Sequence, residues 1–205
     1  MSFFQLPEEI IFPSPELARK DGLLAIGGDL SEERLLKAYS MGIFPWYTED
    51  SPILWWSPDP RLILVPEEVK VSRSLGRVIN KDIFKVTMNT VFEKVIRRCS
   101  EVDRKGQEGT WITEEMIEAY IWLHKAGYAH SVESWHEGEL VGGLYGILLG
   151  KAFFGESMFA SMSNASKVAF VWLVEKLREQ GFKLIDCQVT TGHLIILGAR
   201  EVSRK

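Results

Sequence analysis

The alternation of apolar and polar side chains predicts a run of β-strands in the second half of the chain. Tight turns at 137–138 and 150 separate the first three of them, and a helical period follows over about 164–180, where Gly181 ends it. The expected strands span 129–135, 140–149, 151–155 and 183–189, with a short one near Glu201. Antiparallel strands followed by a central helix and a further strand predict an α+β fold.

The first 65 residues have a different pattern, dense in Pro, Gly and Asp, which favour turns. One helix is expected there, with Ser31 as its N-cap and Gly42 as its stop. A strand is expected from Arg61 to Val65. We therefore expect a small N-terminal domain over 1–65 and a second domain over 66–205.

Two more helices are expected early in the second domain. Thr90 and Glu93 fit the pattern of a capping box, which predicts a helix that runs to about Cys99. Thr113 is the expected N-cap of the next helix, and Gly127 is its expected stop.

The strand near 184–189 carries two polar side chains where a buried strand would normally carry only apolar ones. Side chains alternate faces along a strand, so Asp186 and Gln188 are expected to share one face with Leu184. Burying a carboxylate and a carboxamide is costly unless both have hydrogen-bond partners. Two interpretations are open: a satisfied structural network, or a site whose partner is a reacting amine.

The composition is that of an ordinary globular protein, with 46% hydrophobic and 25% charged residues. No apolar run is long enough to span a bilayer, and the first residues lack the basic flank of a secretory signal. The only cysteines, Cys99 and Cys187, are not spaced as metal ligands. We therefore expect a cytoplasmic protein with free thiols, no metal and no membrane attachment.

Charge is unevenly distributed along the chain. The formal net charge of −4 argues against a globally basic nucleic-acid binder. Residues 1–65 hold 10 acidic and 5 basic side chains, whereas residues 70–105, here termed the basic segment, hold 10 basic and 4 acidic ones. The basic segment fits either a phosphate backbone or a solvated helical face.

Two aromatic segments follow neither a helix nor a strand period. The first joins 42–46 to 53–61, where tryptophans and prolines occur together. It predicts either a rigid surface that stacks on a base or the core of the small domain, with Trp46 at the surface. The second is 109–113, where Trp111 either stacks on a ligand or packs as a hydrophobic staple on the helix that carries Tyr120.

The segment 153–160 reads Phe-Phe-Gly-Glu-Ser-Met-Phe-Ala, and its strand is expected to end at Gly155. Glu156 and Ser157 would then stand at a strand end, placed to meet a substrate amine or hydroxyl, although a solvated loop is an alternative for Glu156. The apolar residues beside them are suited to lining a side-chain pocket.

Five motifs together resemble those of the leucyl/phenylalanyl-tRNA–protein transferase family. They are Gly-Ile-Phe-Pro-Trp at 42–46, Leu-Trp-Trp-Ser-Pro-Asp-Pro-Arg at 54–61, Gly-Thr-Trp-Ile-Thr at 109–113, Gly-Glu-Ser-Met-Phe at 155–159 and Leu-Ile-Asp-Cys-Gln at 184–188. The order of elements likewise resembles the GNAT-like fold of Fem-type aminoacyl transferases, with a mixed, largely antiparallel sheet. The resemblance implies an aminoacyltransferase that moves Leu or Phe, with Met as a further candidate, from charged tRNA to proteins with N-terminal Arg or Lys. Such proteins enter N-degron (N-end rule) degradation.

The resemblance also implies roles for particular residues. Asp186 and Gln188 resemble the catalytic pair that activates the acceptor amine, with Gln188 either taking its proton or holding it in line. The implied substrate contacts are Tyr39, Trp46, Trp111, Tyr120, Leu144, Phe153, Glu156, Ser157, Met158 and Ile185. The implied tRNA contacts are Lys70, Arg73, Arg77, Lys81 and Lys85. Because an aminoacyl ester is already activated, no cofactor or metal is expected. The protein is also expected to act as a monomer.

Two other functions stay open on the sequence. A GNAT-type acetyltransferase would bind the pyrophosphate of acetyl-CoA with a glycine-rich turn into a helix N-terminus, and the segment 156–164 offers no such turn. The other is a non-catalytic module that binds charged tRNA or protein N-termini. The chain departs from the family pattern at Ile195-Ile196, where relatives carry more polar residues, and in ending at Lys205.

Overall fold

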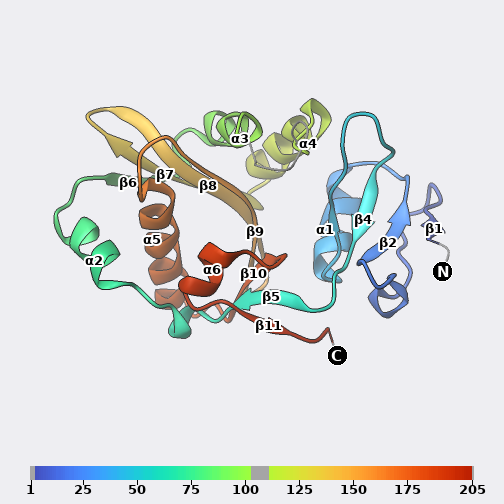
Figure 1. Ribbon diagram of the computed structural model, residues 1–205. Helices are drawn as coiled ribbons and strands as arrows, with labels where there is room; N and C mark the ends of the chain where they lie inside the picture. The colour runs from blue at the N-terminus through green and yellow to red at the C-terminus, as the bar shows by residue number, and fades with distance from the viewer. Residues whose placement is uncertain (1–2, 103–110, 205) are drawn as a thin grey trace.

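The computed structural model describes residues 3–102 and 111–204. Figure 1 shows a small sheet near the N-terminus beside a larger sheet with helices on both faces. The five motifs named above fall on both sheets and on the segments between them, except that residues 109 and 110 lie outside the described residues.

The small sheet has the strand order β1-β2-β4-β3. Its strands are β1 (Phe4–Gln5), β2 (Leu23–Ile26), β3 (Phe44–Pro45) and β4 (Leu54–Trp56), accompanied by the 3-10 turn η1 (Pro15–Leu17) and helix α1 (Glu32–Ser40). Helix α1 begins directly after Ser31, as the sequence predicts. The Ser31 side chain caps no described backbone N–H, and its own N–H donates to Asp29 Oδ1 at 2.8 Å.

The larger sheet has the strand order β11-β5-β10-β9-β8-β7-β6. Its strands are β5 (Arg61–Leu64), β6 (Lys85–Met88), β7 (Ala129–His136), β8 (Glu139–Leu149), β9 (Ala152–Ala160), β10 (Leu184–Gln188) and β11 (Arg200–Val202). Neighbouring strands pair antiparallel except β9 and β10, which are parallel. This mixed, largely antiparallel sheet confirms the α+β fold class expected from the sequence.

Helices cover both faces of the larger sheet. They are the 3-10 turn η2 (Pro66–Glu68), α2 (Arg73–Asn80), α3 (Phe92–Ser100), α4 (Glu114–Lys125), α5 (Ala165–Glu179) and α6 (Gly192–Ile196). Helix α5 packs against β7 and β8 on one face, while α3 and α4 lie on the other (Figure 1). Successive side chains of a strand point to opposite faces of the sheet, so the core has two parts. Leu144 and Phe153 pack with α5 on one face, and Tyr145 and Phe154 pack with α3 and α4 on the other. None of the helices in the described ranges is long and apolar enough to cross a membrane.

The expected capping box at Thr90 and Glu93 is wrong. Helix α3 begins without it, and the Thr90 hydroxyl instead donates to Glu133 Oε2 at 2.9 Å. Glu133 is fully buried on β7 and also accepts hydrogen bonds from Thr87 at 2.6 Å and Ser131 at 2.5 Å. A buried carboxylate needs several donors, and this requirement outweighs the local capping preference of Thr90.

The strand expected to end at Gly155 is longer than the sequence indicates. Strand β9 continues to Ala160, because β8 pairs with it along its whole length. Glu156 and Ser157 therefore lie in mid-strand and not at a strand end or in a loop, and Glu156 is buried.

Strand β5 lies in the larger sheet, where it pairs with β10 and β11. The sequence-based boundary after residue 65 assigns β5 to the first domain. Because β5 shares its backbone hydrogen bonds with strands near the C-terminus, we propose that the two units divide between Trp56 and Arg61.

Candidate active site

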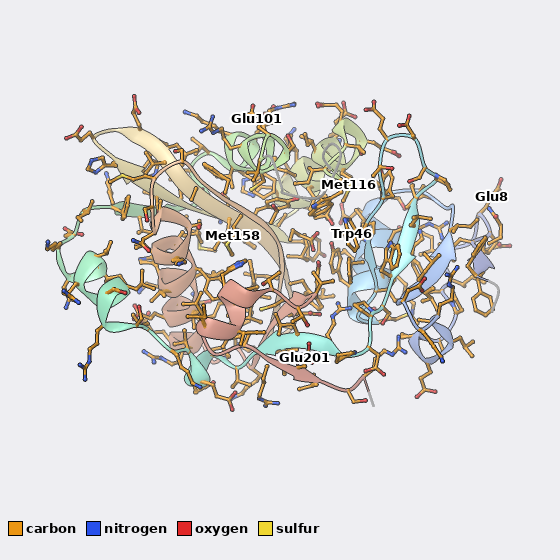
Figure 2. The ribbon with its side chains drawn as sticks, viewed as in Figure 1. Glu8, Trp46, Glu101, Met116, Met158 and Glu201 are labelled. Carbon is orange, nitrogen blue, oxygen red and sulfur yellow. The ribbon has the colours of Figure 1, made fainter. Side chains whose placement is uncertain are left out.

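A cavity of about 330 Å³ opens between the small sheet and the larger one. Residues 44–46 line it from the small sheet, and β8, β9, β10, α5 and α6 supply the other walls. Figure 2 shows Trp46 in the small unit and Met158 on the larger sheet. Nine residues assigned from the sequence line the cavity: Trp46, Trp111, Leu144, Phe153, Glu156, Ser157, Met158, Ile185 and Gln188.

Glu156 is the centre of a buried polar network on the cavity wall. Its Oε1 accepts hydrogen bonds from the Tyr39 hydroxyl and from Gln188 Nε2, both at 2.8 Å, and its Oε2 accepts one from the Tyr120 hydroxyl at 3.0 Å. The two tyrosine hydroxyls also hydrogen bond to each other. Helices α1 and α4 and strands β9 and β10 thus bring together four residues that the sequence singled out.

The network favours a neutral Glu156. Burial raises the pKa of its carboxyl to about 7, against the lowering effect of hydrogen bonds from Tyr39, Tyr120 and Gln188. The contacts that join the two hydroxyls to each other and to the carboxyl need three hydrogens, and the hydroxyls supply two. A protonated carboxyl supplies the third, which is the form that burial favours.

Tyr39 and Tyr120 stand behind Glu156 and do not line the cavity. Burial, with the nearby Glu156 carboxylate, raises the pKa of both hydroxyls well above its usual value, so they stay protonated as donors. Among the polar contacts of the described residues, both tyrosines connect to the cavity through Glu156.

Gln188 ends β10 in an irregular conformation. The pairing of β10 with β5 shifts register between Asp186 and Gln188. The φ of Gln188 is 61°, which lies in the left-handed region. Its backbone N–H donates to Asp186 Oδ1 at 2.9 Å, while its side-chain Nε2 is held by Glu156. With one amide N–H bonded to Glu156, the orientation of the carboxamide is fixed, and its carbonyl oxygen is the acceptor that Gln188 can offer to a ligand in the cavity.

Asp186 lies in a buried ion pair. Its two carboxylate oxygens accept from Arg61 Nε and a terminal nitrogen of the same guanidinium, both at 2.8 Å. The Arg61 guanidinium also lies 4.8 Å from the centre of the Phe44 ring, which lines the cavity. Asp186 itself does not line the cavity, so it acts on the site through Arg61 and through the Gln188 backbone; its assignment as a catalytic residue stays a prediction.

The two expected stacking residues lie at the cavity. Trp46 is half-buried and not fully at the surface as expected, because its ring packs at 5.7 Å from the ring of Trp56. Trp56 Nε1 also donates to the Trp46 carbonyl at 2.6 Å, which fixes the backbone there. Trp111 lines the cavity from the segment before α4.

The five basic residues assigned to tRNA binding do not line the cavity. Lys70, Arg73, Arg77, Lys81 and Lys85 are all exposed, on or beside α2 and β6. Among the described residues none of them forms a salt bridge, so their charges face solvent. Helix α2 lies at the opposite end of the molecule from α1 (Figure 1). Two further charges of the basic segment, at 104 and 105, lie outside the described residues.

Sequence reasoning missed several residues at the site. Phe44 and Arg61 belong to motifs that were noticed, but their partners lie far away along the chain. Thr191 and His193 line the cavity from the start of α6, three and five residues after Gln188, without any periodic signal. Cys187 lines it as well, and burial raises the pKa of its thiol to about 12, so it is not a thiolate nucleophile at neutral pH.

No cluster of three or more His, Cys, Asp or Glu side chains within residues 3–102 and 111–204 is arranged to hold a metal ion. The cavity offers an apolar wall, a fixed carboxamide, a carboxyl that titrates near neutral pH and an imidazole. Such a set can align an amine with an electrophile and assist proton transfer.

Comparison with known proteins places these features in a family. Residues 63–205 match the family described as leucyl/phenylalanyl-tRNA protein transferase, and residues 28–59 match the N-terminal domain of that family. A leucyl/phenylalanyl-tRNA–protein transferase of Syntrophobacter fumaroxidans is 63% identical, covering 100% of this chain and 88% of its own. One from Myxococcus xanthus is 59% identical, covering 95% of this chain and 83% of its own. Among solved structures, FemX shares the fold with a TM-score of 0.57 at 12% identity, over 84% of this chain and 66% of its own.

Proposed function

The chain belongs to the leucyl/phenylalanyl-tRNA–protein transferase family, and from that premise we propose that the cavity receives the aminoacyl end of Leu-tRNA or Phe-tRNA. The acyl group then passes to the α-amine of a protein with N-terminal Arg or Lys, which marks that protein for N-degron degradation. The observation that carries this assignment is the Glu156–Gln188 pair, held at the wall of an otherwise apolar cavity.

The apolar wall suits the side chain of the transferred residue. Leu144, Phe153, Met158 and Ile185 line the cavity together, and about 330 Å³ falls in the range of small-ligand sites. Burial of a Leu or Phe side chain against such a wall contributes about 1.5–3 kcal/mol. Trp46 and Trp111 are placed to stack on the terminal adenosine of the tRNA.

The chemistry follows from the arrangement. An aminoacyl ester is already activated, so alignment of the acceptor amine with the ester carbonyl accounts for most of the rate. Gln188 presents its carbonyl oxygen to the acceptor amine, since its nitrogen is held by Glu156. A carboxamide is a weak base, and its role is to orient the amine rather than to remove its proton.

The exposed charges near α2 are suited to the tRNA body. Each Lys or Arg that neutralises a phosphate strengthens binding at low salt. Lys70, Arg73 and Arg77 form part of this surface, together with Lys81 and Lys85. Because no residue of α2 is among those that line the cavity, this surface would hold the tRNA away from its acceptor end.

An acyl-transfer assay tests the proposal. The protein is incubated with labelled Leu-tRNA or Phe-tRNA and with peptides that differ only in an N-terminal Arg, Lys or Ala. We expect label on the Arg and Lys peptides, with no transfer to the Ala peptide or after ribonuclease treatment. Transfer from acetyl-CoA in place of tRNA, or binding of charged tRNA without any transfer, would refute the proposal.

A further inference from the structure

We propose that His193 is the proton acceptor for the incoming α-amine, and that Thr191, on the same cavity wall, is a second contact for that amine. The inference rests on the proposed function and identifies the part of the site that receives the acceptor. Both residues line the same cavity as Gln188 and come from the turn that joins β10 to α6.

The Thr191 hydroxyl is buried without a hydrogen bond. Its Oγ1 has no partner among residues 3–102 and 111–204, although Thr191 lies at the N-cap of α6, where a threonine commonly caps a backbone N–H. An unsatisfied buried hydroxyl costs about 1–3 kcal/mol. Thr191 is one of the residues that line the cavity, so a rotation of its side chain would bring this oxygen to a substrate N–H.

The His193 ring is available for proton transfer. Burial lowers its pKa, and the positive charge of Lys167 on α5 lowers it further, while no hydrogen bond from a described residue contributes. The other titratable groups on the cavity walls are Glu156 on β9, Cys187 on β10 and Tyr145 on β8. A lowered pKa leaves the imidazole neutral at pH 7, which is the form that accepts a proton. The residue is also exposed to solvent, so a proton can leave the ring.

The other polar groups are less suited to this role. The Glu156 carboxyl is already engaged by three hydrogen-bonding partners, and the Asp186 carboxylate is paired with Arg61. The Cys187 thiol is weakly acidic and remains protonated. Gln188 can orient an amine, but its carboxamide binds a proton too weakly to remove one. His193 is therefore the base in this cavity whose ring remains uncommitted within the described residues.

The step balances as follows. A peptide α-ammonium has a pKa of roughly 7.7–8.0, so near pH 7 it must first lose a proton. His193 takes that proton and passes it to solvent. The neutral nitrogen attacks the ester carbonyl carbon, the C–N bond forms, and the bond between that carbon and the ribose oxygen breaks. The second proton of the nitrogen moves to the departing ribose oxygen, which leaves an amide and a free tRNA hydroxyl.

The test is single-turnover transfer of Phe from Phe-tRNA to an Arg peptide. The rate is measured at pH values from about 5.5 to about 8.5, in steps of about half a pH unit. His193→Ala should lower the rate by about 100-fold near pH 7 with an unchanged melting temperature. The ratio of wild-type to variant rates should rise with pH and level off as His193 loses its proton. Imidazole in the buffer should restore part of the rate.

Two matched variants make the test specific. His130→Gln changes a histidine that lies outside the cavity and hydrogen bonds to Asn89, and it should keep the wild-type rate. Lys167→Gln removes the charge that lowers the His193 pKa, so it should move the acid limb to higher pH, whereas Lys167→Arg should not.

The outcomes separate this inference from the proposed function. If wild-type protein transfers Phe but His193→Ala keeps its rate and pH profile, the inference is overturned and the function stands. A slower His193→Ala with a flat rate ratio and no response to imidazole also overturns it, because that result describes a structural role. Wild-type protein that transfers no Phe overturns both.

Discussion

Replacing Asp186 with alanine is expected to lower the free energy of unfolding by about 3–5 kcal/mol, because it leaves the Arg61 guanidinium buried without its counter-charge. Asp186 and Arg61 are only 6% and 9% exposed, and two 2.8 Å hydrogen bonds join them. The same substitution removes the acceptor for the Gln188 backbone N–H, so transfer should fall together with stability. Urea unfolding followed by circular dichroism measures the first effect, and the acyl-transfer assay measures the second.

Controls separate the buried charge from general damage. Asp21→Ala breaks an exposed ion pair with Arg19 and should cost less than about 1 kcal/mol. The double variant Arg61→Met/Asp186→Leu removes both charges and should recover much of the stability lost by Asp186→Ala. An Asp186→Ala protein with wild-type stability would mean that the pair is not buried as the structure shows.

Glu156→Ala is expected to reduce transfer by at least about 100-fold, the scale of a lost positioning and proton-transfer partner. The substitution deprives Tyr39, Tyr120 and Gln188 of their shared acceptor and frees the Gln188 carboxamide to turn. Each buried donor left unsatisfied costs about 1–3 kcal/mol, so stability should also fall. Transfer per folded molecule, corrected by a melting curve, measures the catalytic part.

Glu156→Gln is the matched control, because a carboxamide imitates the protonated carboxyl. Its oxygen can accept from Tyr39 and Gln188, and its NH₂ can donate to the Tyr120 hydroxyl. The variant should therefore be as stable as wild type or more so. Glu133→Gln, in a second buried carboxylate network outside the cavity, should lower stability but not transfer per folded molecule.

The raised pKa of Glu156 has a defined sign for stability. The folded protein holds this proton up to about pH 7, whereas an ordinary Glu loses it near 4.5. The stability that it contributes is complete below pH 4.5 and is lost as pH rises through 7. Subtracting the Glu156→Gln stability curve from that of wild type should isolate this fall. A difference that does not change across that range would contradict the network described above.

Local sequence patterns predicted most strands of the larger sheet and four helices, because apolar alternation and stop signals such as Gly181 act over a few residues. They missed β6 and the strands of the small sheet. They could not reveal the partners of Glu156, since Tyr39 lies 117 positions away and Tyr120 lies 36 away. The same limit applies to Arg61, which pairs with Asp186 across 125 positions. These contacts arise when β5, β9 and β10 meet in one sheet.

The site residues were recognised from motifs, and the structure changes what several of them do. Glu156 was expected at a strand end, with a solvated loop as the alternative, because nothing local shows that β9 continues past Gly155. Asp186 and Gln188 were expected to act as one pair, yet the bulge between them sends Gln188 to Glu156 and Asp186 to Arg61. His193 carried no signal at all, since α6 is too short to show a period.

A crystal structure of the protein with adenosine carrying phenylalanine on its 3′ position through a stable amide tests the central claim most directly. We predict that the phenyl ring lies against Leu144, Phe153 and Met158, with the adenine on Trp46 or Trp111 and the linking carbonyl facing Gln188. Ligand bound outside this cavity, with the cavity empty at saturating ligand, would contradict it.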